Sequence, residues 1–136
     1  MNFSPPVLVS TDGHVATVLP CRTTHNFVDV ASMNALADPL DAGDADDNCR
    51  VVVIGSQRKS FCAGADCSAL RVGYIRTPML YGQGMRLFRT RKPIVAAVHG
   101  SAIGAGLALM VDFRIACPAS RLRVPFNPLG FHPASA

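Results

Sequence analysis

Two short runs of small residues are the part of the sequence whose composition best suits chemistry. The first is Cys-Ala-Gly-Ala-Asp at residues 62–66, and the second is Ser-Ala-Ile-Gly-Ala-Gly at residues 101–106. Small side chains let a ligand approach the backbone closely, and N–H groups at the start of a helix point outward as donors. Two such turns that converge can hold one carbonyl oxygen between two N–H groups, which is an oxyanion hole. For either turn alone, ordinary packing of a strand against a helix is the commoner explanation.

Several other kinds of site are excluded by what the sequence lacks. Gly104 and Gly106 are not followed by the third glycine of a dinucleotide-binding turn, and no acidic residue stands at the ribose-binding position. No glycine-rich run ends in Gly-Lys-Ser/Thr, so a P-loop is absent from the sequence. The five cysteines are an odd number without a Cys-x-x-Cys pair. We therefore expect free buried thiols, and neither a disulfide framework nor a metal site.

The composition indicates one folded domain that spans residues 1–136. Hydrophobic residues make up 49% of the chain and charged residues 16%, which gives ample material for a packed core. No stretch is long and apolar enough to cross a bilayer, because Gly104, Gly106 and Asp112 interrupt the best candidate. The N-terminus shows no signal-peptide pattern, so the expected location is cytoplasmic. Neither a membrane nor a nucleic acid is expected as a partner.

The apolar pattern predicts an α/β domain with the element order ββαβαβαβ. Thr-Asp-Gly at residues 11–13 separates two β-prone runs and indicates a hairpin. Asp29 is the predicted N-cap of the first helix, and Pro39 is expected to kink or end that helix, no later than Gly43. The other predicted elements are two adjacent strands buried on both faces (50–55 and 94–98), an amphipathic helix (81–91), a turn (99–105), an apolar helix (106–111) and a strand (113–117).

These motifs resemble the enoyl-CoA hydratase/isomerase family, also called the crotonase family. Lys-Ser-Phe-Cys-Ala-Gly-Ala-Asp at residues 59–66 resembles the family signature around its first oxyanion turn, and residues 92–106 resemble the second. Residues 26–40, 44–54 and 112–116 are also similar to the family, in the same order. The resemblance implies a crotonase-like fold of repeated ββα units. Because family members are longer, it also implies a fold incomplete at the C-terminus, without the region that closes the acyl pocket and forms trimers.

The resemblance implies a CoA thioester as the substrate and no further cofactor. The oxyanion donors it implies are the backbone N–H groups of Ala65 and Ala105, and polarising a thioester carbonyl stabilises an enolate-like transition state. It also implies that Lys59 reaches the CoA phosphates, although a solvated loop lysine explains that residue equally well. The residues implied to bind CoA are Lys59, Ala63, Gly64, Ala65, Asp66, Cys67, Ser68, Gly104, Ala105 and Gly106.

Two positions depart from the family pattern in a way that argues against hydratase activity. Family hydratases use two glutamates as acid and base, and the matching positions here are Ala108 and Phe126. All nine acidic residues are aspartates, so no glutamate elsewhere can substitute. His132 is the remaining acid/base candidate, although a surface or packing histidine is the commoner explanation for it.

Two functional hypotheses therefore stay open. The first is an acyl-CoA-binding family member with hydratase or isomerase-type chemistry, which the two intact turns favour. The second is a non-catalytic truncated fragment, or an interaction partner of full-length homologues. An unfinished sheet exposes an edge and an apolar face, which favours homo-oligomerisation or association through that edge.

Overall fold

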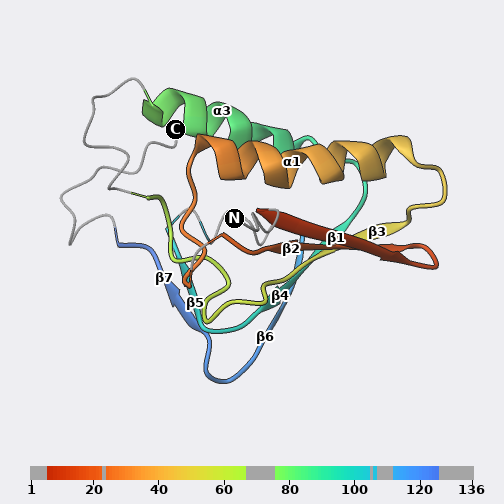
Figure 1. Ribbon diagram of the computed structural model, residues 1–136. Coiled ribbons are helices and arrows are strands. Elements are labelled where there is room, and N and C mark those ends of the chain that lie inside the picture. Colours follow the sequence, from red (N-terminus) through yellow and green to blue (C-terminus); the bar gives the residue numbers. More distant parts are fainter. Residues whose placement is uncertain (1–5, 23, 67–75, 105, 107–111, 126–136) are drawn as a thin grey trace, which may run out of the picture.

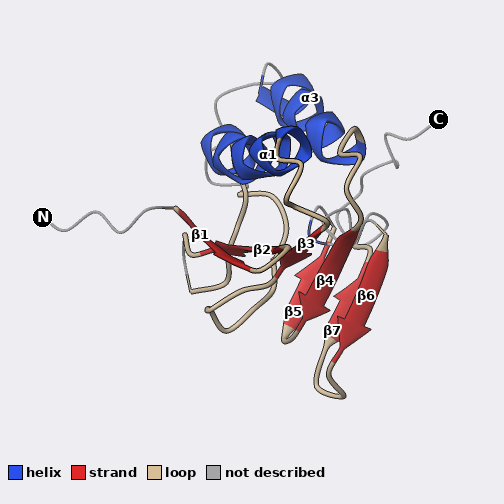
Figure 2. Cartoon of the chain, turned by 90° about the vertical axis from the view of Figure 1, so that its right-hand side faces the viewer, coloured by secondary structure: helices blue, strands red, loops and turns tan. Residues whose placement is uncertain are grey.

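The computed structural model describes residues 6–22, 24–66, 76–104, 106 and 112–125 of the chain. The elements in chain order are β1 (Val7–Asp12), β2 (Val15–Pro20), α1 (Val30–Ala45), β3 (Val51–Ile54), α3 (Arg76–Phe88), β4 (Ile94–Val98), β5 (Ser101–Ile103), β6 (Phe113–Ala116) and β7 (Arg121–Arg123). They form a five-stranded sheet in the order β1-β2-β3-β4-β6 and a separate pair, β5 with β7. Helices α1 and α3 lie side by side over one face of the larger sheet (Figure 1, Figure 2).

The larger sheet combines one antiparallel hairpin with three parallel pairings. Strands β1 and β2 are antiparallel, with Asp12 opposite Val15, and Gly13 makes the turn with a φ of 55°. This confirms the predicted hairpin. Strands β3 and β4 are parallel neighbours, with Val52 opposite Ile94, which confirms the predicted adjacency of the two apolar runs. Parallel neighbours end at the same edge of a sheet, so the turns that follow β3 and β4 start close together.

Helix α1 begins where the sequence predicts and continues further than expected. The Asp29 side chain accepts a hydrogen bond from the Ser32 N–H at 2.8 Å, and the Asp29 N–H donates to the Ser32 hydroxyl at 2.8 Å. This reciprocal arrangement is a capping box, so the predicted N-cap is confirmed. The prediction that the helix stops no later than Gly43 is wrong, because α1 runs through Pro39 to Ala45. A proline inside a helix lowers the stability of the helix by about 3 kcal/mol. Burial of a leucine side chain, as for Leu36 and Leu40 of α1, stabilises the folded chain by about 1.5–3 kcal/mol.

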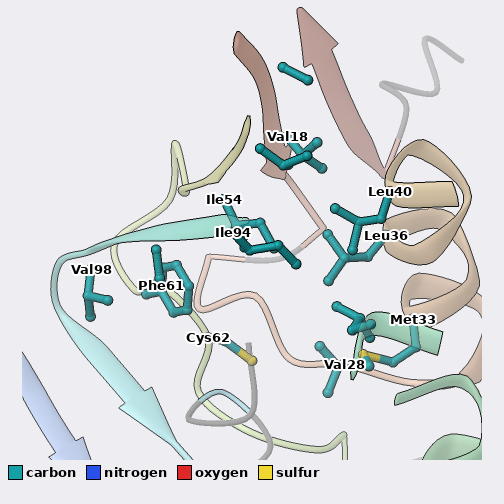
Figure 3. Packing of buried hydrophobic residues seen from close by; sticks show 14 of the residues in the cluster. Val18, Val28, Met33, Leu36, Leu40, Ile54, Phe61, Cys62, Ile94 and Val98 are labelled. Carbon is teal, nitrogen blue, oxygen red and sulfur yellow. The ribbon is translucent and has the colours of Figure 1, made fainter. Parts of the chain in front are cut away.

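The main core lies between the covered face of the sheet and α1 (Figure 3). Its most buried side chains come from β2, β3, β4, α1 and the first small-residue turn. They are Val18, Leu36, Leu40, Val52, Ile54, Phe61, Cys62 and Ile94, with almost no exposed surface. Because Phe61 and Cys62 belong to this cluster, the start of the first turn is fixed by the same packing that holds the sheet and helix together.

The opposite face of the larger sheet is only partly covered in the described part of the chain. Val51 and Val53 of β3 are half-buried, and Phe113 and Ile115 of the edge strand β6 are 62% and 71% exposed. Val95 is paired with Phe113 in the parallel register, so both side chains point to this open face. The prediction that the strands 50–55 and 94–98 are buried on both faces is therefore wrong, because both described helices lie on the same side of the sheet.

The predicted helix 81–91 starts earlier and ends earlier in the structure, as α3. Its last turn tightens, with the Arg89 N–H donating to the Arg86 carbonyl at 3.1 Å, and the chain then leaves the helix. The Arg86 side chain contacts the Asp38 carboxylate at 2.8 Å and also pairs with Asp41, both on α1. These ion pairs join α3 to the helix beside it.

The second half of the chain contains two short strands that were not predicted. The predicted turn 99–105 includes β5, which pairs in parallel with β7, with Ala102 opposite Leu122. Three residues are too few to show an alternating pattern, so neither strand has a signal in the sequence. The predicted helix 106–111 lies mostly outside the described residues. Among the helices that are described, none is long and apolar enough to cross a membrane.

Candidate functional site

The structure brings the two small-residue turns side by side. The Cys62 N–H donates to the Ser101 carbonyl at 3.0 Å, and the Ile103 N–H donates to the Cys62 carbonyl at 2.9 Å. Together these bonds form a parallel bridge between Cys62 and Ala102. The Phe61 N–H extends the pairing to the His99 carbonyl at 3.0 Å. Segments separated by about 40 residues in sequence therefore lie with their backbones paired, and we call the described residues 59–66, 99–104 and 106 the turn junction.

Glycines permit the close approach of the two backbones at the turn junction. A Cβ on Gly106 would lie 2.4 Å from the Cys62 carbonyl oxygen, and a Cβ on Gly100 would lie 2.2 Å from the Lys59 carbonyl oxygen. Both distances are shorter than real Cβ atoms tolerate, so any side chain at either position forces the turns apart. Gly64 has a φ of 102°, a conformation that favours glycine. Glycine is therefore required at these positions because the two turns pack closely against each other.

A third segment, residues 25–28, pairs with the other side of the first turn. The Val28 N–H donates to the Gly64 carbonyl at 2.9 Å, and the Asp66 N–H donates to the Val28 carbonyl at 2.8 Å. This parallel bridge joins Val28 to Ala65. In such a bridge the residue between the two bonded groups directs its own N–H and carbonyl away from the neighbouring strand. The Ala65 N–H therefore points away from Val28.

Asn26 anchors the segment that leads into this pairing, and sequence reasoning gave it no site role. Its side chain is 2% exposed, its φ is 51°, and its amide nitrogen donates to the Ser56 hydroxyl at 2.6 Å and the Pro20 carbonyl at 3.1 Å. The same nitrogen lies 3.3 Å from the Ser60 carbonyl. Asparagine tolerates positive φ better than most residues. The partners of Asn26 lie up to 35 residues away, so no local sequence pattern indicates this role.

The thiol in the turn junction is unsuited to nucleophilic chemistry. Cys62 is 1% exposed, and burial raises the pKa of its thiol to about 11, opposed by a hydrogen bond from the Gly64 backbone. The thiol therefore stays protonated at neutral pH. Among the described residues, no group of three His, Cys, Asp or Glu side chains is placed to hold a metal ion. The groups of the turn junction that remain suited to binding are therefore backbone N–H donors, which lie next to buried apolar side chains.

The predicted site residues divide into those inside and those outside the described part of the chain. Ala63, Gly64, Ala65, Asp66, Gly104 and Gly106 all lie in the turn junction, together with Lys59, whose side chain is exposed. Cys67, Ser68, Ala105 and His132 lie outside the described residues, as do Ala108 and Phe126. The second predicted oxyanion donor, the Ala105 N–H, therefore stays a prediction.

The sheet topology and the paired turns agree with the class of protein that the sequence motifs indicated. The profile of the family described as enoyl-CoA hydratase/isomerase matches residues 13–136, so the chain belongs to the enoyl-CoA hydratase/isomerase family. The match includes both small-residue turns, and the resemblance stated from them is confirmed.

Individual proteins show the same likeness. The chain is 39% identical to the probable enoyl-CoA hydratase EchA14 of Mycobacterium tuberculosis, over 94% of this chain and 53% of that protein. It matches the structure of enoyl-CoA hydratase subunit I from Geobacillus kaustophilus with a TM-score of 0.85 and 27% identity, over 95% of this chain and 52% of that one. The structure of Pseudomonas aeruginosa DspI matches with a TM-score of 0.86 and 25% identity, over 98% and 58% of the two chains.

These matches confirm the predicted α/β fold of the crotonase type. The chain spans about half the length of the curated relatives that it matches.

Proposed function

We propose that the turn junction binds an acyl-CoA thioester and polarises its carbonyl oxygen, the step from which hydratase and isomerase chemistry proceeds. The observation that carries this proposal is the backbone bridge between Cys62 and Ala102, with hydrogen bonds of 3.0 and 2.9 Å. It places the two turns beside each other, as an oxyanion hole built from both of them requires.

The proposed donors are the backbone N–H groups of Ala65 and Ala105. Two features of the described residues support this assignment. The bridge to Val28 directs the Ala65 N–H away from residues 25–28, and the glycine contacts keep bulky side chains out of the junction. The buried Phe61 and Cys62 beneath the turn supply a surface of low polarity. Hydrogen bonds to a developing oxyanion are stronger where water is excluded.

The CoA part of the ligand is proposed to run along the first turn. The exposed ammonium group of Lys59 is suited to a phosphate, and the small residues Ala63 and Gly64 let the pantetheine chain approach the backbone. Asp66, Cys67 and Ser68 would continue this border, with Gly104 and Gly106 on the side of the second turn. No cofactor beyond the CoA thioester itself is proposed.

Hydration by this chain is proposed to be weak. The positions of the two family glutamates hold Ala108 and Phe126, which cannot ionise, and removal of a general acid/base typically lowers a rate by about 10² to 10⁴. His132 is the proposed residual acid/base group. Thioester binding is therefore expected to persist where turnover is low, because the backbone donors do not depend on those carboxylates.

Calorimetric titration of the purified protein with a non-reactive short-chain acyl-CoA tests the proposal. The informative variant is Gly106→Ala, because its new methyl group would meet the Cys62 carbonyl and separate the two turns. Gly82→Ala in α3 is the matched control, because a Cβ there meets nothing within 4 Å. We expect saturable binding that Gly106→Ala weakens and Gly82→Ala preserves.

The outcomes separate cleanly. Absence of binding at millimolar acyl-CoA by a monodisperse, folded protein contradicts the proposal. Equal binding by the Gly106→Ala variant also contradicts it, because the ligand would then lie elsewhere. A parallel assay with a short enoyl-CoA measures hydration, and turnover at the level of an ordinary family hydratase would contradict the expectation of weak activity and direct attention to His132.

A further inference from the structure

One arginine connects the first turn to the start of α1. An Arg22 terminal nitrogen, Nη2, lies 2.6 Å from the Asp29 carboxylate and 3.4 Å from the Asp66 carboxylate. The other terminal nitrogen, Nη1, donates to the Phe27 carbonyl at 3.1 Å. The three side chains are only 22–28% exposed, so the group is largely withdrawn from solvent. A single guanidinium therefore contacts the helix cap, the segment before it and the residue after Ala65.

The Asp29 carboxylate has two separate tasks in this arrangement. One oxygen, Oδ1, accepts the Ser32 N–H at 2.8 Å and caps α1, while the other, Oδ2, binds Arg22. Since the capping box fixes Asp29 relative to the helix, Arg22 is held against a rigid partner. Through the guanidinium of Arg22, the fixed position of Asp29 also restricts the movement of Asp66, which belongs to the turn junction.

The contact with Asp66 bears directly on the neighbouring N–H group. The Asp66 N–H is the last hydrogen bond of the pairing between the first turn and Val28, at 2.8 Å. The peptide that carries the Ala65 N–H lies one residue earlier. The carbonyl of that same peptide, Gly64, accepts the Val28 N–H at 2.9 Å, so the peptide is held on one side by this bond. On the other side its orientation depends on the Ala65 torsions, and the ion pair of Asp66 with Arg22 opposes movement of the chain there.

We propose that Arg22 is a positioning residue, which acts through Asp66 to hold the Ala65 N–H in the direction needed to polarise a thioester carbonyl. This inference rests on the proposed function. Arg22 then affects how strongly the bound carbonyl is polarised, although it does not contact the ligand. Lysine cannot replace it fully, because one ammonium group does not reproduce a planar fork that spans a backbone carbonyl and two carboxylates.

The chain offers a matched control in Arg86. That residue also bridges two aspartates, Asp38 and Asp41, has a similar side-chain exposure of 30%, and also binds α1. Its partners lie on the outer side of α1 and none of them belongs to the turn junction. Arg22→Met and Arg86→Met each remove a guanidinium that is paired with two aspartates, although the partners of Arg86 are more exposed, at 69% and 55% against 27% and 22%. Only the first change disturbs the proposed positioning.

The test measures the carbonyl itself, with butyryl-CoA that carries carbon-13 at the thioester carbonyl. Isotope-edited infrared spectroscopy reports the carbonyl stretch in the bound state, which falls when hydrogen bonds polarise the C=O group. We expect this fall in the wild-type protein and in Arg86→Met, and a much smaller fall in Arg22→Met. The affinity for butyryl-CoA should weaken by about two- to tenfold in Arg22→Met, the range that corresponds to one hydrogen bond, while the affinity for free CoA stays unchanged.

A second variant distinguishes loss of the contact between Arg22 and Asp66 from misfolding of the Arg22→Met protein. Asp66→Asn keeps the size of the side chain and removes the charge that faces Arg22, and it should reproduce most of the Arg22→Met effect. The double variant should then show little additional loss, because both changes break the same contact. Thermal unfolding of each variant establishes that the protein compared is folded.

The possible failures point to different conclusions. If wild-type protein binds no butyryl-CoA or leaves its carbonyl stretch unshifted, the proposed function itself is wrong. If wild type shifts the stretch and Arg22→Met shifts it equally, the positioning role is wrong and the proposed function stands. If Arg22→Met weakens free CoA as strongly as butyryl-CoA, Arg22 contacts the ligand directly and the positioning role is overturned.

Discussion

The carboxylate of Asp112 accepts a hydrogen bond from the backbone N–H of Ile94 at 2.8 Å. Asp112 immediately precedes β6, and Ile94 is the first residue of β4, so the contact fixes the start of two neighbouring strands. The second turn follows β4, and its position therefore depends on the register that this contact helps to set.

Replacing Asp112 by alanine should lower the free energy of unfolding by about 1 kcal/mol, because a hydrogen bond to a charged group near the surface is lost. Denaturant unfolding followed by circular dichroism measures the change. Asp47 is an exposed aspartate in the connection between α1 and β3, and the control variant Asp47→Ala should have little effect. Equal stability of the wild-type and Asp112→Ala proteins would show that the contact contributes nothing to the sheet.

Asn26 should be sensitive both to loss of its side chain and to its backbone conformation. Asn26→Ala removes the donor of the Pro20 carbonyl and one of the two donors near the Ser60 carbonyl, which keeps the Ser56 hydroxyl, so we expect it to lower the free energy of unfolding by about 2–3 kcal/mol. Asn26→Gly loses the same hydrogen bonds but adopts a positive φ without strain, and should be about 1 kcal/mol more stable than Asn26→Ala. Chemical denaturation of both variants checks the order. The reverse order would mean that the positive φ carries no strain.

Cys62 predicts a loss of stability at alkaline pH. Burial raises the pKa of its thiol to about 11, whereas an exposed thiol ionises at about 8.5. Between these two values the unfolded chain releases the proton and the folded chain keeps it, so the free energy of unfolding falls as the pH rises. Unfolding of the wild-type protein and of Cys62→Ala at pH 8, 9 and 10 measures this difference. An equal slope in both proteins would rule out Cys62 as its source.

The open face of the larger sheet predicts self-association that depends on concentration. Phe113 and Ile115 are 62% and 71% exposed on β6, which forms an edge of the sheet. Ile115→Lys should reduce association, because a charge on an edge strand opposes pairing with another chain. Met79→Lys on α3 is the control, since Met79 is 55% exposed but does not belong to the sheet. Sedimentation analysis over a range of concentrations distinguishes the variants, and a monomer at all concentrations contradicts the prediction.

The sequence predicts those parts of the fold that depend on neighbouring residues. The Asp29 cap, the Asp12-Gly13 hairpin and the apolar runs of β3 and β4 each have a local signal, and the structure confirms all three. Helix α1 is the exception, because the cost of Pro39 is local but the burial that outweighs it comes from the sheet. Strands β5 and β7 were missed because a three-residue strand is defined by its partner.

The candidate site follows the same rule. The small residues of 62–66 and 101–106 are visible as motifs, and the structure shows that they meet. Neither Asn26 nor Arg22 was assigned to the site from the sequence. Their roles depend on groups such as Ser60 and Asp66, which come from other parts of the chain.

The central position of the first turn also determines when the site forms. Residues 59–66 lie between residues 24–28 on one side and residues 99–103 on the other. Both sets of contacts join residues about 35 to 41 positions apart, so the cost of closing the loop is nearly the same for each. The two sets differ in their order along the chain, because residues 99–103 follow the first turn and residues 24–28 precede it. During synthesis the first turn is therefore paired on one side only until β5 emerges from the ribosome. Hydrogen exchange in ribosome-bound chains that end before β5 should therefore show protection of the Val28 amide without protection of the Cys62 amide.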